Sequence, residues 1–591
     1  MSETPIGTEE GAWRTPLLQR ITLLRRHEDQ IFLALILAIG ALTGLAVVAF
    51  IVLTERLGMR LYPVGSAAWR RMLIPLGGSL GIGYLLFRYF PDARGSGVPQ
   101  TKAALFAREG VITLGTVLGK FFCTSATLAS GIPLGREGPA VQVGGGIASV
   151  LGRCLGLRPE KVKALLPAGA AAAIAAAFNT PLAAVLFALE EVMADLHAPV
   201  LGSVVLASAT SWLVLRLLLG NNPLFSVPQY RLVHPLEFGV YAVLGVLGGL
   251  VSVAFTKLLL GMRERFLRFP EKTLWFQPVA GGLLVGLMGW FVPQVLGVGY
   301  GYVGDALNGR MALKLMALLV VLKLLGACTS YASGNAGGIF GPSLFIGAML
   351  GGTVGSVSHR LLPAYTATPG AYALVGMGAA FAGIVRAPMT SVLMIFETTR
   401  DYTAIVPLMI SNLVSFFISS RLQREPIYTA LALQNGIHLP ATKTGWRHVQ
   451  RQVNQATRAA TEVLPAQMTV SEALERVKSS TFRAWPVTDR RGVIGVVSLA
   501  RLEREWAEGV AAERLGDLVD ARTFPHVHAD QGLDLALERM GAAGLELLPV
   551  VSRADMNKLE GVITLRDLLE SFGVGSAAQP VQPGTLHRKT G

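Results

Sequence analysis

Hydrophobic residues are distributed very unevenly along this 591-residue chain. Up to about residue 428 the sequence holds long runs without a charged residue, whereas beyond that point charged residues return at the density of an ordinary soluble protein. The clearest uncharged run covers residues 31–54, and about 20 apolar residues are enough to cross a bilayer as a helix. Comparable runs lie at 164–189, 238–256, 273–304, 324–358, 361–385 and 402–420. Because a helix of a soluble protein would show polar residues every third or fourth position, the pattern predicts a polytopic membrane domain followed by a soluble region.

Several of these runs are too long, or too interrupted by glycine and proline, for one straight span. The chain contains 67 Gly and 31 Pro. Interrupted backbone at membrane depth is tolerated only where it is buried in protein or lines a polar cavity. Broken helices therefore favour a transporter or channel over a membrane anchor. The mean hydropathy of +0.50, with 52% hydrophobic and 15% charged residues, excludes a simple soluble enzyme.

The N-terminal segment, residues 1–30, is polar and lacks the apolar core and cleavage site of a signal peptide. Four arginines precede the first apolar run, at Arg14, Arg20, Arg25 and Arg26. Arginines that flank a first span favour a cytosolic N-terminus. The net charge of +14 is explained in this way rather than by nucleic-acid binding, because aromatic and basic residues are not interleaved.

Cysteine usage and motif content argue against catalysis. Cys123, Cys154 and Cys328 lie in the apolar half and show no metal-ligand spacing, so we expect small core residues rather than disulfides or reactive thiols. The sequence contains no recognisable metal cluster, nucleophile triad or phosphate-binding loop. We therefore expect no enzymatic activity, no metal site and no cofactor.

The apolar half contains a diverged duplication. The segment 179–186, which closes at Glu190, aligns with 386–393, which closes at Glu397, at an offset of 207 residues. Upstream, a Gly-Pro pair at 138–139 aligns with a Gly-Pro pair at 341–342 at an offset of 203. Two similar halves, each with a Gly-Pro break beside an apolar helix, are typical of a repeat-built transporter.

A second duplication lies in the soluble region. Residues 473–477 recur at 536–540, and the Pro-Val pair at 486–487 recurs at 549–550, both at an offset of 63 residues. Each copy has the pattern of a helix, a short apolar strand, a turn, a second strand and a helix. The pattern predicts a tandem α/β module of about 60 residues per copy.

Three glycine- and proline-rich motifs precede apolar helices in the membrane half. They are Gly-Ser-Gly-Val-Pro at 95–99, Gly-Arg-Glu-Gly-Pro at 135–139 and Gly-Gly-Ile-Phe-Gly-Pro at 337–342. Each motif predicts a helix start, because proline is tolerated in a first helical turn. The first N–H groups of a helix lack internal partners and carry partial positive charge. Several such ends together can hold an anion. The Ser96 and Tyr428 hydroxyls could add hydrogen bonds, so we expect a small, partly dehydrated anion as ligand.

Glu137, inside the second motif, is the residue with the most specific expected role. Ionisable groups in membrane segments are costly and are functional by default. A carboxylate beside an anion site can occupy that site when ionised and swing away when protonated, which combines a gate with proton coupling. The alternative is that the motif is a solvated turn at the membrane interface in which Arg136 and Glu137 are merely paired.

The order and spacing of these motifs resemble the CLC family of chloride channels and transporters, and the resemblance covers nearly all of the membrane half. It implies that Glu137 is the external gating glutamate. It also implies that the hydroxyls of Ser96 and Tyr428 coordinate a central chloride ion. Ile339 and Phe340 would supply backbone amides to the same ion.

The CLC family divides into passive channels and proton-coupled exchangers. Glu191 matches the internal glutamate of the exchangers, at a position where channels usually have an apolar residue. The implied role is to receive protons from the cytosol and relay them towards Glu137. The alternative is an ordinary charge at a helix end. Glu190 and Glu397 close their repeats equivalently and are interpreted as structural.

The resemblance also bears on the transported anion. Relatives that favour nitrate tend to carry proline at the position of Ser96, and fluoride exporters depart from the second motif and lack the late tyrosine. Chloride is therefore expected. Two positions differ from the common pattern: Gln100 stands where many members have Glu, and Gly341 where Ala is frequent. Lys120 occupies a conventional family position and is expected to raise the local positive potential.

The two soluble modules resemble a CBS domain pair. Such pairs often bind an adenine nucleotide through a Thr or Ser and an Asp three residues later. The second copy has Thr564 and Asp567, whereas the first has Ser498 followed by Arg501 in place of the Asp. One nucleotide site is therefore the most that we expect. The alternative is that the pair packs beneath the membrane domain and stabilises a dimer.

The expected fold is an all-α polytopic membrane domain with two inverted repeats of broken, tilted helices, followed by a cytosolic α/β tandem CBS pair. The predicted segments are a cytosolic segment 1–30, a transport domain 31–435, a linker 436–462, CBS domains 463–518 and 519–573, and a disordered tail 574–591.

The expected function is exchange of chloride for protons by a homodimer in a bacterial inner membrane, with both termini in the cytosol. The alternative is a passive, voltage- or pH-gated chloride channel on the same scaffold. A cation transporter is disfavoured, because cation pathways usually need clusters of carboxylates.

Overall fold

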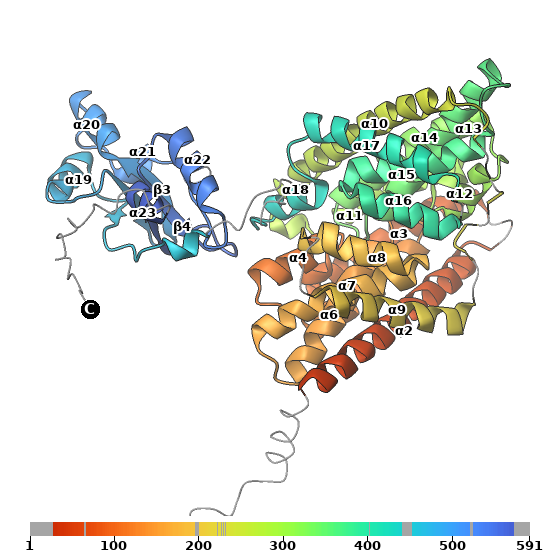
Figure 1. Cartoon of the computed structure of the whole chain (residues 1–591), viewed down its shortest axis with the longest axis horizontal. Helices are drawn as coiled ribbons and strands as arrows, with labels where there is room; N and C mark the ends of the chain where they lie inside the picture. Colours follow the sequence, from red (N-terminus) through yellow and green to blue (C-terminus); the bar gives the residue numbers. More distant parts are fainter. Residues whose placement is uncertain are drawn as a thin grey trace, which may run out of the picture. The chain divides into compact units, whose positions relative to one another are not determined.

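The computed structural model describes residues 28–63, 65, 67–195, 200–220, 223–225, 227–228, 230, 232–400, 402–439, 452–520 and 524–571. The predicted cytosolic arginine-rich segment, most of the linker and the predicted disordered tail lie outside these residues. The chain forms two compact units, Met1–Gln434 and Asn435–Gly591 (Figure 1).

The first unit is helical, and one series of helices occurs in it twice. The first series is α2 (Glu28–Leu61), α3 (Ala68–Arg88), α4 (Val98–Ala107), α5 (Leu114–Ala129), α6 (Glu137–Cys154), α7 (Pro159–Phe178), α8 (Pro181–Phe187) and α9 (Leu201–Leu219). The second is α10 (Glu237–Leu267), α11 (Pro278–Phe291), α12 (Tyr300–Leu307), α13 (Leu313–Ala332), α14 (Phe340–Leu361), α15 (Pro369–Val385), α16 (Pro388–Thr399) and α17 (Ile405–Leu422). Helix α18 (Ile427–Gln434) ends the unit. The two series lie side by side, in warm and in green colours (Figure 1).

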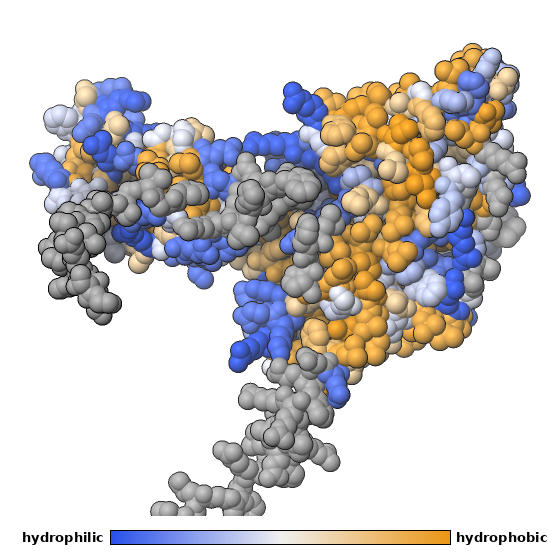
Figure 2. All heavy atoms as spheres, in the orientation of Figure 1, coloured by the Kyte–Doolittle hydropathy of each residue, from blue (hydrophilic) through white to orange (hydrophobic). Residues whose placement is uncertain are grey.

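The helices of this unit fit a membrane. Within the described residues, seven are long and apolar enough to cross a bilayer. Figure 2 shows apolar side chains spread over the visible face of the unit, and many large ones, such as Leu217 and Phe291, are exposed. Exposed apolar surface on this scale is expected where lipid replaces water. The chain is therefore an integral membrane protein.

The long uncharged runs are broken where glycine, proline or a left-handed residue ends a helix. The run at 164–189 contains α7 and α8, which are separated by Asn179 with φ +60° and begin again with Pro181. The second series repeats this break at Arg386, whose φ is +65°. The Arg386 guanidinium donates to the carbonyl of Ser419 at 3.1 Å, which holds this unusual backbone for a non-glycine residue.

The two series meet at their glycine-rich loops. The N–H of Gly135 donates to the carbonyl of Gly338, and the N–H of Gly338 donates to the carbonyl of Gly135, both at 2.7 Å. This antiparallel pairing relates the loops by a local two-fold axis, as inverted repeats require. Buried lysines support each half equivalently. Lys120 donates to the carbonyl of Gly95 at 2.6 Å, and Lys323 donates to that of Gly297 at 2.5 Å.

Each half also caps a helix of the other. The Glu397 carboxylate, near the end of α16, accepts hydrogen bonds from the N–H groups of Leu182 and Ala183 at 3.1 and 2.7 Å. The Glu190 carboxylate accepts from the N–H groups of Met389 and Thr390 at 3.3 and 2.8 Å. Carboxylates at helix N-termini satisfy free donors and complement the helix dipole. The prediction that these two glutamates are structural therefore has a geometric basis.

We expect Glu397→Ala to destabilise the membrane unit by about 2 kcal/mol, because two backbone donors lose a charged acceptor. The measurement is the thermal unfolding midpoint of the detergent-purified protein, with the exposed Glu160→Ala as the matched control. Equal midpoints for the two variants would show that the reciprocal caps contribute nothing.

The second unit contains two copies of one α/β module. The first copy comprises β1 (Leu464–Pro465), α19 (Val470–Val477), β2 (Ala484–Asp489), β3 (Gly492–Ser498), α20 (Leu499–Ala507) and α21 (Leu515–Leu518). The second comprises α22 (Leu533–Ala543), β4 (Leu547–Val551), β5 (Leu559–Thr564) and α23 (Leu565–Ser571). β2 pairs antiparallel with β3 and parallel with β1, and β4 pairs antiparallel with β5. The predicted order of helix, strand, strand and helix is present in both copies.

Candidate functional site

The first motif places Ser96 directly before α4, fully buried. Gly97 has φ +105°, and a Cβ there would lie 2.2 Å from the carbonyl oxygen of Gly138, so only glycine fits. Gln100 closes the turn: its Oε1 accepts from the N–H of Gly97 at 2.8 Å, and its Nε2 donates to the carbonyl of Arg94 at 2.9 Å. A glutamate, frequent here in the family, could not donate the second bond when ionised.

The starts of α6 and α14 converge on Ser96. A methyl group on Gly138, in the first turn of α6, would lie 2.7 Å from Ser96 Oγ and 3.4 Å from the Cα of Gly338. Gly338 precedes Ile339 and Phe340, where α14 begins. Phe340 is fully buried, with its ring centroid 4.4 Å from that of Phe381. The starts of α4, α6 and α14, where the three motifs predicted helices to begin, therefore lie close together.

Two buried hydroxyls in this region are available to a ligand. Ser96 Oγ and Tyr428 Oη are both fully buried, and neither makes a hydrogen bond of ordinary length within the described part of the chain. Buried polar groups in proteins are normally hydrogen-bonded, so two unpaired buried hydroxyls indicate that a ligand or water binds here. Hydroxyl donors beside helix N-termini suit a small anion. The residues therefore fit the predicted chloride as a transported ligand.

Glu137 is the first residue of α6 and is fully buried, so the alternative of a solvated interfacial turn does not describe this structure. Its Oε1 accepts a hydrogen bond from the hydroxyl of Tyr300. Its Oε2 lies against the first turn of α14, 3.3 Å from where a Cβ on Gly341 would stand. The alanine that is frequent in the family would crowd the carboxylate here. Arg136 lies over the Tyr300 ring, 5.6 Å from its centroid.

Glu191 lies in a π-helical turn, Ala188–Met193, and is also buried. π-turns inside helices are frequent at functional sites. Lys102 Nζ, on α4, lies 2.7 Å from Glu191 Oε1, and both side chains are almost inaccessible. Glu191 is therefore not an ordinary exposed charge at a helix end.

Several residues of this region were not predicted from the sequence. Tyr300 and Lys102 contact the two glutamates, and the hydroxyl of Tyr331 accepts the N–H of Ser96 at 3.3 Å. Motif spacing carries no signal for these side chains, since each belongs to a distant segment. Lys323 was detectable, because it follows Lys120 at the 203-residue offset of the repeats.

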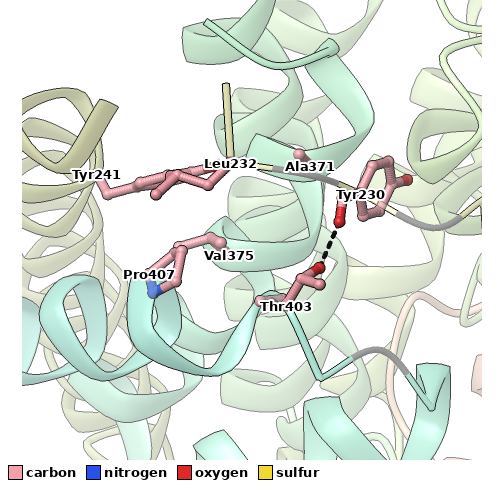
Figure 3. A pocket seen from close by; sticks show the side chains of 8 residues that line it. Tyr230, Leu232, Tyr241, Ala371, Val375, Thr403 and Pro407 are labelled. Atoms are coloured by element: carbon pink, nitrogen blue, oxygen red, sulfur yellow. Dashed lines mark hydrogen bonds between the residues drawn. The ribbon is translucent and has the colours of Figure 1, made fainter. Parts of the chain in front are cut away.

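A small pocket of the membrane unit involves none of the predicted site residues. It lies among α10, α15 and the start of α17, and Figure 3 shows its lining: Tyr230, Leu232, Tyr241, Ala371, Val375, Thr403, Ala404 and Pro407. Thr403 Oγ1 donates to the backbone carbonyl of Tyr230 at 2.5 Å. This mostly apolar lining offers little to bind an anion.

The predicted nucleotide residues form helix caps. Thr564 Oγ1 donates to Asp567 Oδ2 at 2.7 Å, and Asp567 is also paired with Arg458. Ser498 Oγ accepts the N–H of Arg501 at 3.3 Å. The Asp567 carboxylate is thus already engaged by a cation, and nucleotide binding stays a prediction.

Comparison with protein families agrees with the architecture. The family model described as "Voltage gated chloride channel" matches residues 77–420. The CBS domain model matches twice, at residues 458–508 and 515–573.

Individual relatives agree with these matches. The H(+)/Cl(-) exchange transporter ClcA of Vibrio campbellii is 33% identical over 370 residues, which are 61% of this chain and 79% of that protein. A solved structure of a slow cyanobacterial Cl-/H+ antiporter matches with 27% identity and a TM-score of 0.63, over 68% of this chain and 97% of that one. A eukaryotic CLC transporter shares the fold over 93% of this chain and 98% of that one, with 20% identity and a TM-score of 0.61.

Proposed function

Because the chain belongs to the voltage-gated chloride channel family, we propose that it is a secondary active antiporter that exchanges chloride for protons across a membrane. The names of its relatives support exchange, since the Vibrio campbellii protein is an H(+)/Cl(-) exchange transporter. The observation that carries the proposal is that two carboxyl groups are buried in the membrane unit, Glu137 against the first turn of α14 and Glu191 against Lys102 of α4.

In the proposed mechanism, the chloride ion is held by hydrogen bonds rather than by a full cation. The hydroxyls of Ser96 and Tyr428 would donate to it, together with the N–H groups of Ile339 and Phe340 at the start of α14. The first N–H groups of a helix have no partner inside the helix and favour negative charge. Binding through partial charges allows release as well as entry, which conduction requires.

Glu137 would act as the gate. Its ionised carboxylate lies beside the first turn of α14, where negative charge is stabilised, and so competes with chloride for that position. When a proton neutralises the carboxyl group, this attraction falls and an anion can replace the side chain. One group thereby links the entry of a proton to the movement of chloride.

Glu191 would supply protons from the other side. It is buried and lies in the π-helical turn that faces α4, where Lys102 holds one carboxylate oxygen. Within the described residues the second carboxylate oxygen makes no hydrogen bond, which leaves an acceptor for a proton. Tyr428 would separate the two glutamates, so that chloride and protons share only part of the route.

One observation favours the alternative of a passive chloride channel. Lys102 Nζ lies 2.7 Å from Glu191 Oε1, so this acid can be explained as the partner of a buried lysine without any role in proton transfer. Simultaneous measurement of proton and chloride movement in liposomes separates the two functions, because only an antiporter couples them.

We expect Tyr428→Phe to weaken chloride binding at least about tenfold, because a hydrogen bond to a charged group contributes about 1.5–3 kcal/mol. Calorimetric titration of the purified protein with chloride measures the effect. Tyr84→Phe, which removes an exposed hydroxyl on α3, is the matched control and should bind chloride as the unmutated protein does. Unchanged affinity in Tyr428→Phe would remove this hydroxyl from the proposed site.

We also propose that the protein is a homodimer in a bacterial inner membrane with cytosolic termini, as the family resemblance implies. The exposed apolar side chains of the membrane unit (Figure 2) offer surface for lipid and for a second copy. Cross-linking in native membranes tests the dimer.

A further inference from the structure

Three histidines of the second unit gather at one point. A ring nitrogen from each of His438, His526 and His528 lies within 4.8 Å of one from each of the others. His528 is buried and the other two are partly buried. His526 and His528 precede α22, whereas His438 belongs to the segment that follows α18. Residue spacing did not predict this cluster, because a distant segment contributes the third ring.

Backbone carbonyls fix the tautomers of two of the rings. His526 Nδ1 lies 2.9 Å from the carbonyl oxygen of Phe524, and His528 Nδ1 lies 2.8 Å from that of Val551. A carbonyl oxygen only accepts, so each Nδ1 carries the proton and each Nε2 keeps its lone pair. This is how metal-ligating histidines are usually oriented by their surroundings.

A metal ion binds an imidazole ring through the lone pair of its neutral form. The rings also contact one another, with centroids 5.1–5.6 Å apart. Ring packing alone does not use the lone pairs of the Nε2 atoms, whereas metal binding does.

The charges around the cluster select the kind of cation. Arg553 donates to the carbonyl of His438 at 3.0 Å and pairs with Asp530 at 2.7 Å, and Arg539 donates to the carbonyl of His526. Two guanidinium groups against one carboxylate disfavour a hard cation such as Ca²⁺ or Mg²⁺, which requires oxygen ligands. A borderline metal bound through neutral imidazole nitrogens is less affected.

We propose that His438, His526 and His528 form a binding site for a divalent transition metal, with Zn²⁺ as the best match. Tetrahedral Zn²⁺ with Zn–N bonds of about 2.0–2.1 Å places its ligand nitrogens about 3.4 Å apart, so the rings would move inward by about 1.4 Å at most. The bound ion would tie the segment after α18, the helix of Tyr428, to the second α/β module. The inference does not depend on the proposed antiport.

The test uses the full-length protein in detergent, purified through a tag without histidines and dialysed against Zn²⁺. We expect one tightly held zinc ion per chain. We expect His438→Ala and His526→Ala each to weaken zinc binding by on the order of 100-fold or more, since even loss of a group that orients a ligand costs 10–100-fold. His234→Ala, which removes a histidine of the membrane unit, is the matched control and should leave zinc binding unchanged.

Two further readouts keep the result clear if a variant folds poorly. Co²⁺ bound to the unmutated protein should give the visible absorption of a tetrahedral nitrogen-ligated site, and added Zn²⁺ should abolish it. His438→Gln, in the connecting segment, should elute as the unmutated protein does in size-exclusion chromatography yet lose this absorption. No zinc bound by the unmutated protein, or equal binding by the His438, His526 and His234 variants, would overturn the proposal.

Discussion

In liposomes that contain Glu137→Ala, chloride is expected to cross the membrane while proton movement falls at least about a hundredfold, within the range that a positioned proton-transfer group contributes. Alanine leaves no carboxylate beside the first turn of α14, so nothing competes with chloride there and nothing carries a proton to that place. Chloride flux should also lose its dependence on external pH, because the group that opens the gate on protonation is gone.

The control for this variant is Glu55→Gln. Glu55 is an exposed carboxylate that lies 3.8 Å from Arg136, beside the buried Glu137. Its neutralisation changes the local charge without touching the gate, so coupled transport should persist. Coupled proton movement in Glu137→Ala at the unmutated rate would contradict the gating role.

The second large effect is expected for Glu191→Gln, which should stop proton movement to a similar extent but leave chloride transport in place. The amide keeps the shape of the side chain and an acceptor for Lys102, while it can no longer carry a proton. Unlike Glu137→Ala, this variant retains the gating carboxylate, so its chloride flux should still respond to external pH.

The neighbouring Glu190→Gln is the matched control. Glu190 accepts the N–H of Thr390 through an oxygen that glutamine also provides, and it lies one residue away from the proposed proton donor. Coupling should therefore survive in Glu190→Gln. Loss of coupling in Glu190→Gln together with full coupling in Glu191→Gln would show that the proton route uses the other acid.

Local sequence features predicted the architecture well. Uncharged runs and Gly-Pro breaks determine structure within a few residues. The membrane domain, the helix starts at Glu137 and Phe340 and the two duplications could therefore be predicted from the sequence. The matches to the voltage-gated chloride channel and CBS families confirm the recognised families and the fold. Helix boundaries were harder to predict, because absence of charge does not mark where a helix ends. The uncharged run at 273–304 contains α11, a 3-10 turn and the start of α12.

The partners of the two glutamates could not be predicted. Tyr300 contacts Glu137 from α12, and Lys102 contacts Glu191 from α4, and both contacts depend on how distant helices pack. Lys102 matters most for function, because it contacts the acid on which the proposed proton route depends. The same limit hid the histidine cluster, in which His438 meets two residues of another module.

The most direct test of antiport is made on the unmutated protein in liposomes with a chloride gradient and no proton gradient. If the protein is an antiporter, chloride running down its gradient will drive protons in the opposite direction, even against a proton gradient imposed afterwards. Chloride flux without any proton movement would contradict the account and identify the protein as a passive chloride channel.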